Sequence, residues 1–250
     1  MKTISKYLAL VMLILALVVT ACKKDEQTSV GFSMKATGTS APDQASKQPI
    51  VGTEIQEQLA LKWDVAWMYI TQLEFNARYN SFSTEDDNEK HPDIHLVWQG
   101  NQKVNLLEEP KIFADLELEN GLYDEISLQL TSSRITGTYG PNFYLSGMFG
   151  PVLGGTPIAV SVTKSFKMMM KFEDWTINTE KDEFYNGLIE ISLNHVFNGI
   201  TTAELAMAER FDGWILIDAM HNTGLYARIL ANLQVDSEDG LHWDAKIINP

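Results

Sequence analysis

The sequence has a single cysteine and no apolar run long enough to cross a bilayer. Cys22 has no second cysteine in the 250 residues with which to form a disulfide. A membrane-spanning helix needs about 20 predominantly apolar residues, and the most apolar stretch, Tyr7–Ala21, has fifteen uncharged, mostly apolar residues. These two absences exclude a disulfide-stapled fold and an ordinary transmembrane helix, and they leave Cys22 without a structural explanation.

Positive charge is also scarce. The chain has 19 basic and 33 acidic residues, which gives a formal net charge of −14. Removal of Lys2 and Lys6 with the N-terminal segment would leave 17 basic residues and a net charge of −16. A surface of this sign repels phosphate backbones, so we expect no nucleic-acid partner and attribute the acidity to solubility.

The first 21 residues have the organisation of a signal peptide. Lys2 and Lys6 precede the short apolar run, and small residues follow it directly before Cys22. This order of a basic region, an apolar region and small residues is that of a secretory leader that is removed. We therefore expect cleavage immediately before Cys22.

The residues around Cys22 favour lipidation. Val19, Thr20, Ala21 and Cys22 resemble the lipobox of bacterial lipoproteins, in which the thiol receives diacylglycerol and the new amine is acylated after cleavage. Several acyl chains anchor a protein stably, because each buried CH₂ contributes about 0.8 kcal/mol. The alternative is an ordinary signal peptide with an incidental Cys22. We favour the lipid anchor.

The residues after Cys22 suggest a destination. Lys24, Asp25 and Glu26 resemble the lipoprotein export signal of Bacteroidetes, a cysteine followed by a lysine and two acidic residues, which directs lipoproteins to the outer leaflet of the outer membrane. A charged tether that leaves the protein facing the periplasm is the alternative. The resemblance implies an outer-membrane, cell-surface location.

The mature chain is predicted to be one large β domain. We assign residues 1–21 to the signal peptide, 22–29 to the acylated cysteine and tether, and 30–250 to the domain, with a Gly/Pro-rich segment at 150–157 as an alternative division point. Apolar residues alternate with polar ones from residue 59 to residue 79. This period of two predicts a long strand that buries Trp63, Trp67 and Tyr69, with a bend between Ala66 and Ile70, where both faces are apolar.

Further strand patterns extend through most of the chain. We expect a hairpin between 94–98 and 104–106 with Gly100 in its loop, and a tight turn at Asn120-Gly121. The other predicted strands cover residues 30–36, 126–130, 143–149, 158–162, 166–172, 188–193 and 214–217. Helices are predicted at 201–210, capped by a threonine, and at 222–233, with Asn222 as a cap. The fold class is therefore mainly β, an antiparallel β-sandwich with two short helices in the C-terminal third.

One metal-like pattern occurs. His91, Asp93 and His95 would align on one strand face and suit zinc or copper, but the sequence offers no fourth ligand. The acidic segments 85–89 and 236–244 lack the spacing of a calcium loop and are interpreted as solvated turns. We assign no metal site and no cofactor.

Motifs of catalysis are not found. The sequence has no G-x-S-x-G elbow, phosphate-binding loop or dinucleotide fingerprint, and lipidation would consume the only thiol. We therefore expect a protein that is not an enzyme, although two carboxylates brought together by the fold could still form a hydrolase site. The six tryptophans suggest a sugar-stacking surface, for which Trp98, Trp175 and Trp243 are the less constrained candidates.

The strand sequences resemble a family of uncharacterised β-rich lipoproteins of Bacteroidetes. The resemblance covers about residues 60–233 and includes the turn from Asn120 to Ile126 and the segments "FKMMMKF" and "DGWILID". It implies a β-rich fold and no catalytic residues. From these observations we expect a surface-exposed binding or adhesion module for a glycan or protein ligand. A structural or accessory subunit of a fimbria-like assembly, which needs a detachable N-terminal strand, is the alternative.

Overall fold

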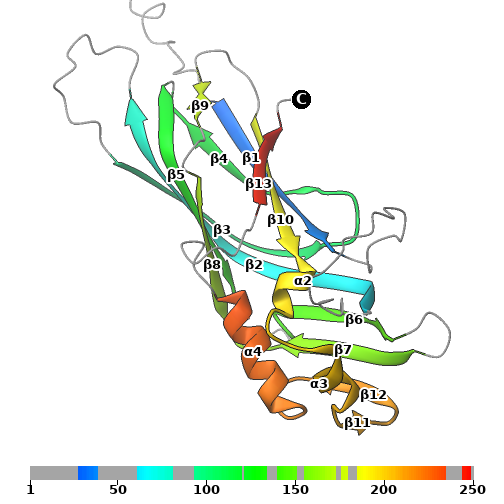
Figure 1. Cartoon of the computed structure of the whole chain (residues 1–250). Coiled ribbons are helices and arrows are strands. Elements are labelled where there is room, and N and C mark those ends of the chain that lie inside the picture. Colours follow the sequence, from blue (N-terminus) through cyan, green and yellow to red (C-terminus); the bar gives the residue numbers. More distant parts are fainter. Residues whose placement is uncertain are drawn as a thin grey trace, which may run out of the picture.

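The computed structural model describes residues 28–38, 61–80, 93–119, 121–133, 140–150, 155–172, 176–179, 185–234 and 244–248. In this part of the chain, two β-sheets and three short helices enclose one apolar core (Figure 1). The predicted mainly β fold is confirmed. Cys22, Lys24, Asp25, Glu26 and His91 lie outside the described residues.

The smaller sheet has the strand order β13-β10-β1-β4, and the larger sheet has the order β11-β12-β7-β6-β2-β5-β8, with β3 paired to β2 and β9 paired to β5. The strands are β1 (Thr28–Thr37), β2 (Leu61–Asn80), β3 (Asp93–Asn105), β4 (Ile112–Leu118), β5 (Leu122–Ser132), β6 (Phe143–Phe149), β7 (Thr156–Val162), β8 (Phe166–Phe172), β9 (Ile177–Asn178), β10 (Tyr185–Ser192), β11 (Arg210–Phe211), β12 (Trp214–Ile217) and β13 (Asp244–Ile248).

The first strand lies inside the smaller sheet. β1 pairs parallel with β10 and antiparallel with β4, and Val30, Phe32 and Met34 are buried. Phe32 of β1 meets Phe75 of β2 at 6.5 Å between ring centroids, so the two sheets share a core. β7 and β12 also pair in parallel. The sheets are therefore mixed, whereas the sequence pattern predicted antiparallel pairing, because alternation shows which face is buried and not the direction of a neighbouring strand.

β2 organises the larger sheet. Its pairing shifts register at Trp63/Val65 with β6, at Ile70/Gln72 with β3 and at Asn76/Arg78 with β5. The first two irregularities change the face to which the next side chains point. The buried set accordingly passes from odd to even positions and back, through Leu61, Trp63, Ala66, Met68, Ile70, Leu73, Phe75 and Ala77. Irregularities flank the predicted segment Ala66–Ile70 on both sides and do not fall within it. Trp67 and Tyr69, which were predicted to be buried, lie on the face opposite to the core.

Two strands of the larger sheet pair with successive parts of the same edge of β2. β3 follows one edge of β2 from residue 67 to residue 78, so β6, which pairs with residues 61–68, and β5, which pairs with residues 72–80, share the other edge. Figure 1 shows the resulting shape, with β6, β7, β11 and β12 in the lower half and β5 and β8 above them. This curled arrangement gives β6, β7 and β12 a face of their own on the side away from the core.

β3 is one continuous strand and not the predicted hairpin. Gly100 lies within the strand, and a Cβ atom at this position would be 2.3 Å from the Trp98 ring. The indole of Trp98 therefore lies over the glycine, and it also meets Phe113 of β4 edge-on at 6.0 Å. A glycine that suggests a turn in the sequence instead makes room for an aromatic ring within a strand.

Both predicted helices are present, although α3 is shorter than expected. Thr201 caps α3 (Thr202–Ala206) in a capping box with Glu204. α4 (Thr223–Leu233) buries Leu225, Ile229 and Leu233, as its helical spacing predicted. Asn222 directly precedes α4, but its side chain does not cap the helix. A third helix, α2 (Leu193–Val196), begins at the end of β10 and was not predicted.

Candidate functional site

The side of the β12-β7-β6-β2-β3 strands that faces away from the core is the candidate site. Directly opposed residues of paired strands share a face, and the register places Leu216, Ala159, Ser146 and Val65 in one row across four strands. We call this surface the outward face. It consists of Lys62, Asp64, Val65, Trp67, Tyr69, Lys103, Asn105, Tyr144, Ser146, Met148, Pro157, Ala159, Ser161, Trp214 and Leu216.

Three aromatic side chains form a row on the outward face. Trp67 and Tyr144 are directly opposed on β2 and β6, and their rings stack with centroids 5.6 Å apart. Tyr69 meets Trp67 edge-on at 5.5 Å. The Nζ atom of Lys103 on β3 lies 4.1 Å from the centroid of the Trp67 ring, a cation–π contact. We call Tyr69, Trp67 and Tyr144 the aromatic row; all three are half-buried.

Beside the aromatic row, the outward face exposes several apolar side chains to solvent. Val65 is 40% exposed, Met148 is 36% exposed and Trp214 is 41% exposed. Leu216 and Pro157 lie between them and are half-buried. The opposite side of the same strands is also apolar, since Ile158, Val160, Ile215 and Ile217 are fully buried in the core. An ordinary two-layer domain leaves such a second face polar.

Acidic residues are scarce on the outward face. Lys62, Asp64 and Lys103 are its only charged residues, although the chain carries 33 acidic and 19 basic residues. The Nζ atom of Lys62 is 3.9 Å from the Oδ1 atom of Asp64. The excess of carboxylates therefore lies elsewhere in the chain, and the two lysines and one aspartate give the outward face a formal charge of +1.

Of the three weak metal-ligand candidates, Asp93 and His95 lie in the described part of the chain and His91 does not. Asp93 and His95 are exposed on β3. The Nδ1 atom of His95 is 2.6 Å from the Oδ1 atom of Asn76, and Asp93 lies opposite Arg78 on β2. Among the described residues, no group of three or more histidine, cysteine, aspartate or glutamate side chains could hold a metal ion.

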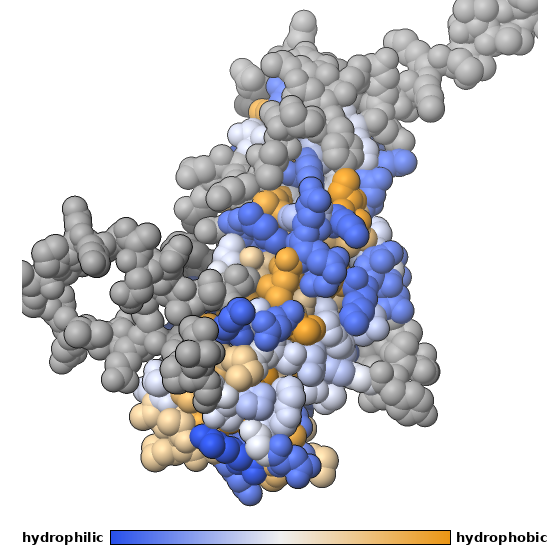
Figure 2. All heavy atoms as spheres, turned by 90° about the vertical axis from the view of Figure 1, so that its right-hand side faces the viewer, coloured by the Kyte–Doolittle hydropathy of each residue, from blue (hydrophilic) through white to orange (hydrophobic). Residues whose placement is uncertain are grey.

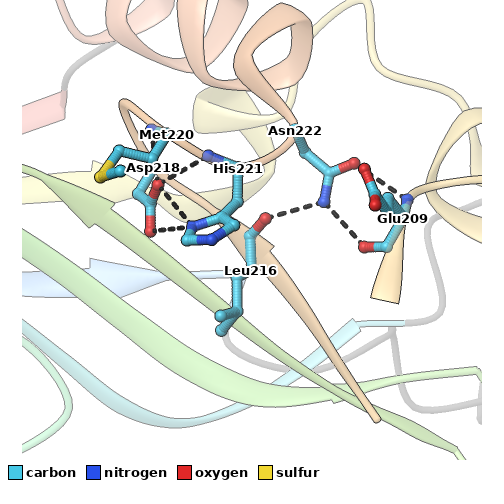
Figure 3. A network of polar contacts seen from close by, with 6 residues as sticks. All are labelled: Glu209, Leu216, Asp218, Met220, His221 and Asn222. Atoms are coloured by element: carbon cyan, nitrogen blue, oxygen red, sulfur yellow. Dashed lines mark hydrogen bonds and ion pairs between the residues drawn. The ribbon is translucent and has the colours of Figure 1, made fainter. Parts of the chain in front are cut away.

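A histidine–carboxylate pair at the end of β12 has a structural role (Figure 3). The Nδ1 atom of His221 is 3.0 Å from each carboxylate oxygen of Asp218, which also accepts the backbone N–H groups of Met220 and His221. Burial alone would raise the pKa of Asp218, but these hydrogen bonds lower it overall. They fix the turn between β12 and α4.

Asn222 hydrogen-bonds the same turn to Glu209, which precedes β11, and to Leu216 of β12. Its backbone is left-handed, with φ 47°. Its Nδ2 group donates to the carbonyl oxygens of Glu209 and Leu216, and its Oδ1 atom accepts the N–H of Glu209. The side-chain amide thus both donates to and accepts from backbone groups, as a peptide group does in a sheet. Because it is engaged in these hydrogen bonds, it does not cap α4.

No family model, no curated protein and no solved structure matches this chain. None of the helices in the described residues is long and apolar enough to cross a membrane.

Proposed function

We propose that this protein is a lipid-anchored docking protein that binds a protein partner through the outward face. The exposure of Val65, Met148 and Trp214 beside the aromatic row carries the proposal. Contiguous apolar surface is uncommon on monomeric soluble proteins and marks interaction sites. Aromatic residues and methionine are enriched in protein interfaces, and this face carries Trp67, Tyr69, Tyr144, Trp214 and Met148.

A protein partner fits the outward face better than a glycan. Sugar rings stack on open aromatic faces, but the Trp67 ring is already in contact with the Tyr144 ring and with the ammonium group of Lys103. The row of Leu216, Ala159, Ser146 and Val65 provides a single polar side chain for sugar hydroxyl groups. A matching partner has an apolar centre and carboxylates placed opposite Lys103.

The proposal includes the anchor predicted from the sequence. Acylated Cys22 would hold the protein in the outer membrane, and Lys24, Asp25 and Glu26 would direct it to the cell surface, as the resemblance to Bacteroidetes lipoproteins implies. β1 begins six residues after Cys22, a distance of at most about 20 Å in an extended chain. The end of the molecule that carries the start of β1 and β9 would therefore lie near the membrane, and the end formed by α3, β11 and β12 would point away (Figure 1).

The fimbria-like alternative requires β1 to leave the domain. β1 is paired on both edges, and Val30, Phe32 and Met34 are buried. Its release would break two ladders and expose three core side chains. No feature of the described residues favours this exchange over docking.

Site-specific photocrosslinking on intact cells tests the docking proposal. A photoreactive phenylalanine analogue replaces Val65 on the outward face or, as a control, Val97 on β3, which is also 40% exposed. We expect a discrete protein adduct from position 65 and none from position 97. Met148→Asp combined with the photoreactive residue at 65 is expected to abolish the adduct. Equal adducts at both positions, or only an adduct of the chain with itself, would contradict a separate partner on this face.

Replacement of Cys22 tests the anchor independently. Cys22→Ser removes the thiol that would be acylated, so we expect no incorporation of labelled palmitate and a soluble or uncleaved product. Cells that express the unaltered protein serve as the control. Palmitate incorporation into the serine variant would refute acylation at Cys22 without affecting the docking proposal.

A further inference from the structure

A cavity of about 230 Å³ lies at the corner where the chain leaves the larger sheet for the smaller one. It is formed by the last residues of β3, the connection to β4 and the first residues of β4. Its lining consists of Gln102, Lys103, Val104, Asn105, Glu108, Glu109, Lys111, Ile112 and Phe113. We call it the corner cavity. We infer that the corner cavity is a binding site for a single neutral sugar ring.

The size of the corner cavity limits the ligand to one ring. Pockets for drug-sized molecules have volumes of about 300–1,000 Å³, and this one is smaller. The β3–β4 connection lies on the right in Figure 1, the side that Figure 2 displays, where hydrophilic side chains border hydrophobic ones. Gln102, Glu109 and Lys111 of the lining are exposed, so the site is open at the surface and accessible to the end or branch of a larger molecule.

The lining combines apolar and polar groups in the way that a sugar requires. Val104, Ile112 and Phe113 provide apolar walls, and Ile112 is 50% exposed. A pyranose has a C–H face that packs on such walls, and hydroxyl groups that both donate and accept hydrogen bonds. Amide, carboxylate and ammonium groups around the rim of the cavity can satisfy those hydroxyls.

The balance of charge favours a neutral ligand. The corner cavity contains two lysines and two glutamates, within a chain of net charge −14. The Nζ atom of Lys103 lies over the Trp67 ring, and the Oε1 atom of Glu108 accepts a hydrogen bond from Asn105. Glu109 and Lys111 remain, one charge of each sign, so the lining selects against a ligand with net charge of either sign.

Several rim groups are available, and others are held in place. Gln102, Glu109 and Lys111 form no side-chain hydrogen bond or ion pair within the described residues. By contrast, the Nδ2 group of Asn105 donates to Glu108 at 2.7 Å, and its Oδ1 atom accepts the N–H of Leu107 at 3.1 Å. This contact fixes the connection, so the cavity is organised before a ligand arrives.

Binding of monosaccharides to the purified full-length protein in detergent tests the inference. Glucose, galactose, mannose and N-acetylglucosamine are compared by saturation-transfer NMR with glucuronate, glucosamine and glycine. We expect saturable binding of at least one neutral sugar. Lys111→Ala and Glu109→Gln, which preserves shape, should each weaken it about tenfold or more, because each removes a charge-assisted hydrogen bond.

Matched surface variants and the docking variant provide the controls. Lys164→Ala and Glu117→Ala alter exposed residues outside the corner cavity and should leave binding unchanged, as should Val65→Asp on the outward face. Thermal unfolding verifies that each variant is folded. Absence of binding by every neutral sugar, tighter binding of any charged compound, or equal losses in the cavity and control variants would each overturn the inference.

Discussion

Two glycines show how local backbone spacing governs the effect of the same substitution. Gly147 of β6 lies opposite Trp63, where a Cβ atom would be 2.0 Å from the carbonyl oxygen of Lys62. Gly224 lies in the first turn of α4, where a Cβ atom would meet no atom within 4 Å. One position has no room for a methyl group, and the other has open space.

Gly147→Ala is therefore expected to destabilise the protein, and Gly224→Ala is not. The first change forces two backbones apart, and overpacking of this kind lowers the free energy of unfolding by about 1–3 kcal/mol. The second replaces a poor helix former with the best one and should raise the free energy of unfolding by up to about 1 kcal/mol. Urea unfolding of both variants measures the two effects. A neutral Gly147→Ala variant would contradict the close approach of β6 to β2.

At the scale of elements, β2 is the strand whose two faces decide the location of the candidate site. Trp63 and Trp67 are four residues apart and would share a face in a regular strand. Instead, Trp63 is 5% exposed and stacks on Phe197 at 5.3 Å, whereas Trp67 is half-buried on the outward face. The register shift between Trp63 and Val65 separates them.

Alanine at each tryptophan tests this separation. Trp63→Ala leaves a cavity in the core and should cost about 3–5 kcal/mol of unfolding free energy. Trp67→Ala removes ring stacking and a cation–π contact at the surface and should cost about 1–2 kcal/mol. Chemical denaturation of the two variants gives the comparison. Equal losses would place Trp67 in the core, as the period of two had predicted.

The same strand shows how far sequence reasoning extends. The alternation of apolar and polar residues was sufficient to predict a long strand and an irregularity near its middle. It could not show which face is inward after the irregularity, because Ala66–Ile70 is apolar on both faces. Gly100 misled the prediction of β3 for a related reason, since the contact with Trp98 that explains it is a matter of packing.

The candidate binding surfaces were still less predictable. The outward face consists of residues from five strands, and its apolar row forms only through the pairing of β2, β6, β7 and β12. The corner cavity lies where the chain passes between sheets, and a turn was expected earlier in the same strand. Neither has a local sequence motif, whereas the lipobox-like segment around Cys22 is continuous and could be recognised directly.

At the scale of the whole molecule, the proposed anchor gives the fold a direction. Glu119 follows Leu118, which pairs with the first residue of β1, Thr28. Met207 ends α3 and is 79% exposed at the opposite end of the molecule (Figure 1). A domain tethered through Cys22 would hold Glu119 close to the membrane and Met207 far from it.

Cysteine labelling on intact cells tests this direction. Cys22 is the only native cysteine and would be acylated, so Glu119→Cys and Met207→Cys each introduce a single reactive thiol. We expect a bulky polyethylene glycol maleimide to modify position 207 faster than position 119 on cells, because the membrane and its surface layer obstruct the tethered end. In detergent, where this obstruction is removed, the two rates should become similar. Equal rates on cells would contradict the short tether, and labelling of neither position before lysis would place the domain on the periplasmic side.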